Sequence, residues 1–90
     1  MYARTDAMRT NSTVMLAVDL SRNIVFRKWV STFTPGIDLV TEDQAAMFIR
    51  YVCEIESRAE LATNDEAVQR FNKILRRYFH AWRDEQHRNQ

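Results

Sequence analysis

An all-α fold with few, long helices is what the sequence predicts, and three observations lead to it. The 90 residues include one glycine and one proline, so tight turns must be rare and the elements between them long. Two segments, Thr41–Gln44 and Thr63–Glu66, match the capping box that begins a helix. The residues after each box repeat apolar side chains at intervals of three and four, as one face of a helix requires.

Length and composition also exclude several classes of protein. A chain of 90 residues forms one domain with a thin core, and one glycine excludes glycine-rich phosphate or dinucleotide loops and the nucleophile elbow. The only cysteine, Cys53, excludes an intrachain disulfide and stands in no zinc-binding spacing, so we predict no metal and no other cofactor. No apolar run is long enough to span a membrane, and we expect a protein of the reduced cytoplasm.

The N-terminal third holds the most ambiguous element. Residues 1–11 are polar without a clear period, so we predict a flexible arm there and a single helical domain over 12–90. Residues 12–33 fit one helix, although apolar side chains then fall on both of its sides. They also fit a β-hairpin, because apolar residues alternate between Val14 and Leu20. We favour the helix, since no glycine supports the turn and a lone hairpin would be poorly covered.

The remaining two segments predict a long antiparallel helix hairpin, over about residues 41–62 and 64–86. Thr34, Pro35 and Gly36 end the preceding element and leave a short connection to the first of these helices. The apolar stripe of the first helix comprises Phe48, Val52, Ile55 and Ala59. The stripe of the second comprises Val68, Phe71, Leu75, Tyr78 and Trp82. Because the link between them is so short, the helices must be antiparallel neighbours, and the chain is predicted to be a three-helix protein.

The apolar arcs of these helices are too wide for a small monomer to cover. The arc of the 41–62 helix spans more than half of its circumference, and the aromatic side chains exceed the interior of three helices. Surplus apolar surface of this kind indicates a homodimer or a protein partner. The side chains that we expect at this dimer or partner interface are Phe26, Trp29, Val30, Phe33, Met47, Ile49, Tyr51 and Cys53.

A basic face lies opposite the apolar stripe of the second hairpin helix. We expect its cations to form a charged rim that selects a protein partner by charge complementarity. This rim comprises Arg70, Lys73, Arg76, Arg77 and Arg83. The same cations could follow the phosphates of a nucleic acid, which is the alternative function. Nucleic acid is the less favoured partner, because residues 41–62 carry two arginines against five acids and long antiparallel helices do not match a helix-turn-helix motif.

Catalytic chemistry finds little support in the sequence. His80 and His87 stand seven residues apart, about 10 Å along a helix, which is too far for one metal ion. His80 also faces away from the predicted hairpin contact, so it cannot pair with Cys53. We therefore predict no catalytic residue and no enzymatic activity.

Three segments together carry a resemblance to a known family. They are NSTVMLAVDLSRNIVFRKWV at 11–30, TEDQAAMFIRYVCEIESRAELA at 41–62 and DEAVQRFNKILRRYFHAWRDEQHRNQ at 65–90. The chain resembles the small helical quorum-sensing antiactivators of the QslA family. This resemblance implies a dimer that binds the ligand-binding domain of a LuxR-type transcription factor, occupies its dimerisation surface and so prevents DNA binding. It implies contact residues and no catalytic ones.

Overall fold

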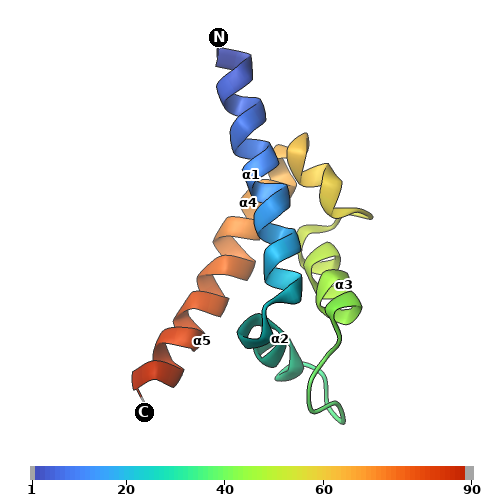
Figure 1. The fold of residues 1–90 in the computed structure, drawn as a ribbon, viewed down its shortest axis with the longest axis vertical. Coiled ribbons are helices and arrows are strands. Elements are labelled where there is room, and N and C mark those ends of the chain that lie inside the picture. Colours follow the sequence, from blue (N-terminus) through green and yellow to red (C-terminus); the bar gives the residue numbers. More distant parts are fainter. Residues whose placement is uncertain (1, 89–90) are drawn as a thin grey trace.

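The computed structural model describes the backbone of residues 2–88 and the side chains of residues 12–88, and every regular element in this part of the chain is helical (Figure 1). The predicted all-α class is therefore confirmed. The elements in chain order are α1 (Tyr2–Arg22), α2 (Ile24–Ser31), α3 (Glu42–Cys53), the 3₁₀ helix η1 (Arg58–Ala62), α4 (Asp65–Arg70), the π-helical segment η2 (Phe71–Arg76) and α5 (Arg77–Arg88).

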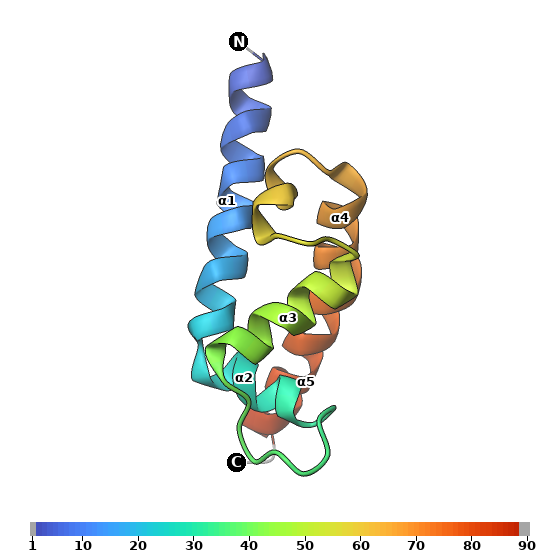
Figure 2. The ribbon, with the colours of Figure 1, turned by 90° about the vertical axis from the view of Figure 1, so that its right-hand side faces the viewer.

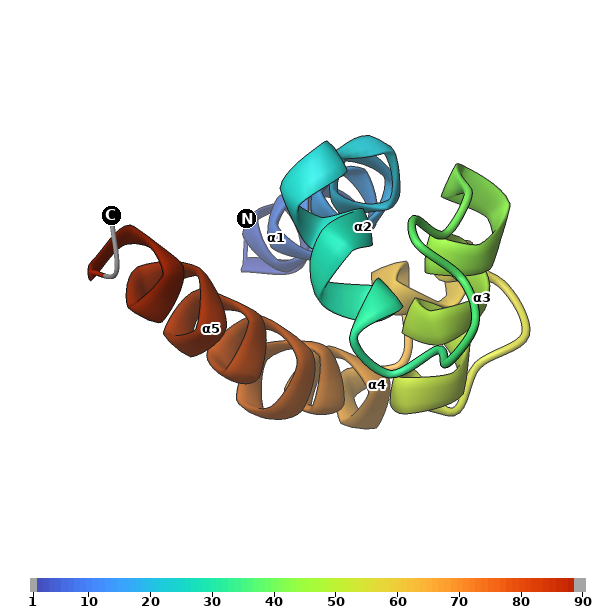
Figure 3. The ribbon, with the colours of Figure 1, turned by 90° about the horizontal axis from the view of Figure 1, so that it is seen from below.

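Two long helical rods frame the molecule, which measures 46 × 28 × 18 Å. One rod is α1, and the other is the continuous run of α4, η2 and α5. Figure 2 shows α3 crossing between them, with α2 beneath the lower end of α1. Seen from below, α5 leads away from the other helices toward its C-terminal end (Figure 3). The elements between the rods supply most of the contacts that fill the core.

Regular structure begins earlier than the sequence indicated. The backbone is helical from Tyr2 onward, so residues 2–11, predicted to be a flexible arm, are the first turns of α1. Met1 lies outside the described residues. In Figure 1 these turns extend beyond the rest of the molecule, whereas the second half of α1 packs against η1 and α3.

Residues 12–33, predicted as one helix, form two helices that meet at Asn23. The Asn23 side chain accepts hydrogen bonds from the backbone N–H groups of Val25 at 2.8 Å and Phe26 at 3.1 Å, and so caps α2. The break lets Leu20 of α1 and Phe26 of α2 both enter the core. The weak helical period of this segment, which also allowed a hairpin, therefore results from two helices whose buried faces are out of phase. No strand occurs in residues 2–88.

The helix predicted over 41–62 ends at Cys53. Glu54 adopts a left-handed backbone with φ of 59°, and the Ile55 N–H donates to the Arg50 carbonyl at 3.0 Å, which is the Schellman pattern of a helix end. The turn brings Leu61 into the core, where it is fully buried. On a continued helix Leu61 would lie on roughly the opposite side from Phe48. Burial of Leu61 therefore explains why the chain leaves the helix.

One predicted capping box is confirmed and the other is wrong. Thr41 and Gln44 exchange hydrogen bonds, with Gln44 N–H to Thr41 Oγ1 at 3.1 Å and Thr41 N–H to Gln44 Oε1 at 2.8 Å. At the second site the cap is Asn64 and not Thr63. Its side-chain oxygen accepts from the Ala67 N–H at 3.0 Å, so α4 begins one residue later than predicted.

This difference gives a direct test of the cap. Asn64→Ala is expected to lower the free energy of unfolding by about 1 kcal/mol, because it leaves helix N–H groups without an acceptor. Thr63→Ala is the matched control and should change stability by less than about 0.5 kcal/mol, since Thr63 is exposed. Urea unfolding followed by circular dichroism measures both. A larger loss in the Thr63 variant would restore the predicted box.

The second rod buries a line of side chains that are spaced four residues apart. Ala67, Phe71, Leu75 and Phe79 are four residues apart, and each is at most 2% exposed. In an α-helix such a line drifts by about 40° at every step. The wider turns of η2 remove this drift, because a π-helix places more residues in each turn. The predicted stripe is therefore wrong at Tyr78, which is 58% exposed, whereas Trp82 at its end still packs against the core.

An aromatic cluster closes the core around this line. The Phe79 ring lies edge-on to Phe26, with ring centroids 5.2 Å apart, and contacts Trp29 at 5.6 Å. Such pairs add to the stability gained from burial alone. The core side chains that are nine-tenths buried or more, apart from alanines, are Leu20, Phe26, Trp29, Val30, Val40, Ile49, Cys53, Ile55, Leu61, Phe71, Leu75 and Phe79.

Candidate protein-binding groove

Two stacked phenylalanines form an aromatic ridge on the surface between α2 and α3. The rings of Phe33 and Phe48 are nearly parallel, 18° apart in plane, with centroids 5.6 Å apart. Trp29 supports both from below, with its ring edge-on at 5.3 Å from Phe33 and 5.6 Å from Phe48. Trp29 is buried, whereas Phe33 is 58% exposed. The ridge is thus rigidly supported and open to solvent.

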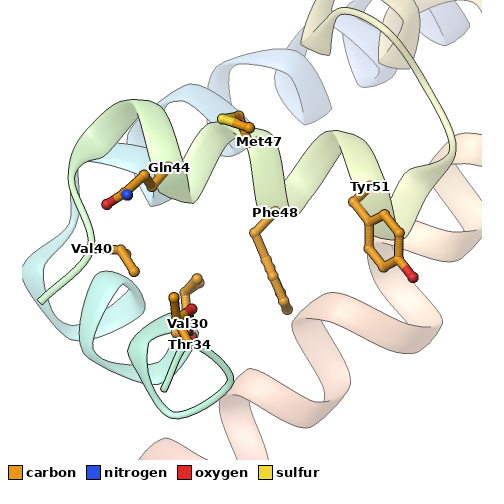
Figure 4. Close-up of a pocket in the computed structure, with 7 residues that line it drawn as sticks. All are labelled: Val30, Thr34, Val40, Gln44, Met47, Phe48 and Tyr51. Atoms are coloured by element: carbon orange, nitrogen blue, oxygen red, sulfur yellow. Dashed lines mark hydrogen bonds between the residues drawn. The ribbon is translucent and has the colours of Figure 1, made fainter. Parts of the chain in front are cut away.

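A hollow of about 290 Å³ lies on one side of Phe48, between α3 and the end of α2. Figure 4 shows Phe48 extending from α3 into the space between α2 and the second rod, with Met47 and Tyr51 on the same helix as Phe48. We name this hollow the α2–α3 hollow. Its lining residues are Val30, Thr34, Val40, Gln44, Met47, Phe48 and Tyr51.

A second hollow of about 400 Å³ lies on the other side of Phe48, toward the second rod. We name it the aromatic hollow, and the two hollows together the Phe48 groove. Its lining residues are Trp29, Phe33, Phe48, Val52, Ile74, Leu75 and Tyr78. Because Phe48 lines both hollows, they form adjoining parts of one apolar surface.

The groove carries few polar groups and no charged side chain among its lining residues. Two of the polar groups are already engaged, since Gln44 Oε1 belongs to the capping box and Thr34 Oγ1 donates to the Val30 carbonyl at 3.2 Å. The hydroxyl groups of Tyr51 and Tyr78 remain for a ligand. Such a surface suits the apolar side chains of a partner.

The structure separates the eight predicted interface residues into two groups. Three are exposed near the groove, and they are Phe33, Met47 and Tyr51. The other five belong to the core of the monomer, which corrects their assignment: Phe26, Trp29, Val30, Ile49 and Cys53. Of these five, Trp29 and Val30 still line a hollow from within. The apolar arcs therefore indicated the right region but included residues that the fold itself covers.

Two further groove residues, Ile74 and Tyr78, are absent from the predicted interface, and Tyr78 belongs to the stripe predicted to be buried. Both are exposed, and both line the aromatic hollow. Their spacing of four matches a buried α-helical stripe, so nothing in the local sequence separated them from the core. The π-helical segment η2, which shifts the buried line onto Phe79, decides their position.

The predicted charged rim is also divided by the structure. Arg70 is neutralised, because its Nε lies 3.1 Å from a Glu54 carboxylate oxygen and its Nη2 lies 3.7 Å from Glu66. Lys73 and Arg77 are exposed, and neither forms an ion pair within the described part of the chain. Two further rim residues have partners without charge. Arg76 donates to Asn72 Oδ1 at 3.0 Å, and the Arg83 guanidinium lies over the Phe79 ring at 5.7 Å.

The positive charges along this helix face affect the pKa of His80. Burial lowers the pKa of His80, and the positive charges of Arg83 and Arg76 lower it further, while Asp84 acts in the opposite direction. The imidazole therefore favours its neutral form, and the positive charge of the face comes from lysine and arginine. Within the described residues no group of three His, Cys, Asp or Glu side chains is placed to hold a metal ion.

The thiol of Cys53 lies in the core and not on the groove. Burial raises its pKa from 9.0 to about 11, although the positive charge of Arg70 acts in the opposite direction. A thiol with this pKa stays protonated at neutral pH and is a poor nucleophile.

We therefore expect Cys53 to resist a maleimide reagent at pH 8 in the folded protein and to react quickly in urea. Because the folded pKa exceeds the unfolded one, this thiol contributes stability that is present below pH 9 and is lost as pH rises toward 11. Unfolding curves at increasing pH, compared with those of Cys53→Ala, measure this loss. Fast labelling of the native protein would contradict the buried position.

Comparison with protein-family models, with curated proteins and with solved structures finds no match to this chain. Among the described residues, no helix combines the length and apolar character that crossing a membrane requires.

Proposed function

We propose that this protein is a non-enzymatic, cytoplasmic regulator that acts by binding another protein through the Phe48 groove. The observation that carries the proposal is the exposed aromatic surface, in which Phe33, Met47 and Tyr51 are each at least 58% exposed around two apolar hollows. Aromatic side chains beside pockets are typical anchors of protein interfaces. The lining carries no charged side chain, which favours binding over catalysis.

The partner that we propose is a LuxR-type quorum-sensing activator. The three segments that resemble the antiactivator family support this choice, because that resemblance implies binding at the receptor's dimerisation surface. An apolar groove suits such a surface, since the interfaces of stable dimers are rich in apolar side chains. Occupying that surface would keep the receptor from dimerising and so from binding DNA.

We further propose that the protein itself is a homodimer. Besides the groove, Met15 and Ile24 are exposed apolar side chains on α1 and α2 that line neither hollow. They offer a second apolar surface on which two copies can associate. Light scattering coupled to size exclusion at micromolar concentration should give about twice 10.7 kDa. A monomer at that concentration would remove this part of the proposal.

A gel-shift experiment tests the proposed function. Purified protein is added to a LuxR-type receptor and its DNA site, and the shifted complex is expected to disappear as the protein reaches excess. Phe33→Ala combined with Tyr51→Ala should restore DNA binding, because both side chains are exposed and their loss leaves the fold intact. Leu39→Ala is the control, because Leu39 is an exposed apolar side chain that lines neither hollow and belongs to neither proposed interface. Undiminished DNA binding at large excess would contradict the proposed partner.

The alternative function is nucleic-acid binding by the basic face of the second rod. The observation in its favour is that Lys73 and Arg77 are exposed without an ion pair in the described residues. This alternative predicts direct binding of DNA or RNA that weakens steeply with salt. The same gel-shift series, run without the receptor, distinguishes the two functions.

A further inference from the structure

Charge is segregated between the body of the protein and the second half of its second rod. Residues 71–88 contain five lysines and arginines against two acids, a net charge of +3. Residues 12–70 contain six basic residues against nine acids, a net charge of −3. The cations are thus concentrated on η2 and α5, the elements that supply one wall of the aromatic hollow.

Two of these cations directly precede groove residues in the sequence. Lys73 precedes Ile74, and Arg77 precedes Tyr78, so each cation is next to a side chain that lines the aromatic hollow. We name Lys73 and Arg77 the cationic edge. They are four residues apart, a spacing at which like charges on a helix repel each other by a few tenths of a kcal/mol. A negative group placed between them would relieve this repulsion.

No ion pair among the described side chains neutralises this edge. The carboxylates of Glu54 and Glu66 both pair with Arg70 instead. The cationic edge is therefore available to a partner, whereas the neutralised Arg70 is not. The second rod thus carries both a wall of the aromatic hollow and the cationic edge, so a partner that binds along this wall meets both.

From this juxtaposition we infer that the partner inserts an acidic amphipathic helix into the Phe48 groove. The apolar face of that helix fills the hollows on either side of Phe48, and its carboxylates meet Lys73 and Arg77. The inference rests on the proposed function and specifies the chemistry of its partner. On this model the charges of Lys73 and Arg77 select the partner, and apolar contacts in the groove supply most of the binding free energy.

A helix fits this surface better than the other modes of recognition. The described residues contain no strand, so an extended peptide finds no sheet edge to join. Side chains on one face of a helix recur at three and four residues, so neighbouring ones can enter adjoining hollows. Nucleic acid is disfavoured at this position, because the body that carries α3 is net negative and repels phosphates.

A peptide-binding experiment tests the inference without any natural partner. The probe is an 18-residue peptide of alanine and glutamate with leucines along one helical face, and its counterpart carries lysine in place of glutamate. Trp29 lines the aromatic hollow, so its fluorescence in a Trp82→Phe background reports occupation of the groove. At 50 mM salt the acidic peptide should bind at least about tenfold more tightly than the basic one.

Reversing the charges of Lys73 and Arg77 tests whether they cause the preference for the acidic peptide. Lys73→Glu with Arg77→Glu should weaken the acidic peptide about tenfold or more and favour the basic peptide instead. The matched control is Arg76→Glu with Arg88→Glu, which makes the same change in net charge on the same rod. Arg76 follows the fully buried Leu75 and already donates to Asn72, and Arg88 lies ten residues beyond Tyr78, so the control should retain most of the affinity.

Each other outcome overturns the inference. Equal binding of the two peptides, or no binding of either up to millimolar concentration, removes the acidic helix. Equal losses in the edge and control variants remove the cationic edge. A single-stranded 18-nucleotide DNA that displaces the peptide would assign the edge to nucleic acid. Conversion of a dimer to a monomer by the peptide would assign the groove to a second copy of the chain.

The proposed function can fail independently. If the groove variants release a receptor while the peptides show no charge preference, only the inference about charge is wrong. If the acidic peptide binds as expected but no receptor is inhibited, the named partner is wrong and the chemistry of the groove stands.

Discussion

Phe79→Ala is expected to lower the free energy of unfolding by about 3–5 kcal/mol, while Tyr78→Ala lowers it by less than about 1 kcal/mol. Phe79 is 2% exposed and contacts the rings of both Phe26 and Trp29. Its removal leaves a cavity at the centre of the aromatic cluster, which a small core cannot easily close. Tyr78 lies on the surface, so its truncation to alanine removes few buried contacts.

The pair of variants also discriminates between the two registers of the second rod. A regular α-helix continuing the predicted stripe would bury Tyr78, and the larger loss would then fall on Tyr78→Ala. Urea unfolding monitored by circular dichroism gives both values under the same conditions. Equal losses, or a larger loss at Tyr78, would show that η2 does not shift the buried line.

Deleting Asn72 is expected to leave the protein folded, because one residue fewer turns η2 into ordinary α-helix. After the deletion, Phe71, Leu75 and Phe79 stand at intervals of three and four, which is the natural spacing of one α-helical face. The side chain of Asn72 itself is exposed and bonds only to Arg76. We expect the thermal midpoint to change by a few degrees, with helix content retained.

The matched control deletes Met47, whose side chain is also exposed. In α3 no π-helical turn is present to absorb the change, so Ile49 and Cys53 would rotate by about 100° out of the core. Loss of cooperative unfolding is the expected result. Circular dichroism and differential scanning calorimetry measure both variants, and similar damage from the two deletions would contradict the role given to η2.

The π-helical segment links the fold to the groove. With the buried line on Phe79, Ile74 and Tyr78 turn to the surface and form a wall of the aromatic hollow. The same segment carries Lys73, so the shape of the hollow and the position of the cationic edge depend on one local feature. π-Helical turns within α-helices are often found at functional sites.

Local signals in the sequence predicted what depends on a few neighbouring residues. The capping box at Thr41 and Gln44 forms as expected, because both of its hydrogen bonds lie within four residues. Gly36 has φ of +87° in the connection before α3, where proline and glycine predicted a break. The wide apolar arcs also pointed to Phe33, Met47 and Tyr51, which are exposed beside the groove.

By itself the sequence determined the helical class, the starts of several helices and the surplus of apolar surface. Only the tertiary structure decided where helices end and which aromatic side chains remain outside. Glu54 ends α3 without a glycine because the core gains Leu61, and η2 departs from the α-helix because it keeps Phe71, Leu75 and Phe79 in one line. In both places the chain departs from a regular α-helix because the departure buries side chains that are distant in the sequence. A local sequence pattern contains no information on such burial.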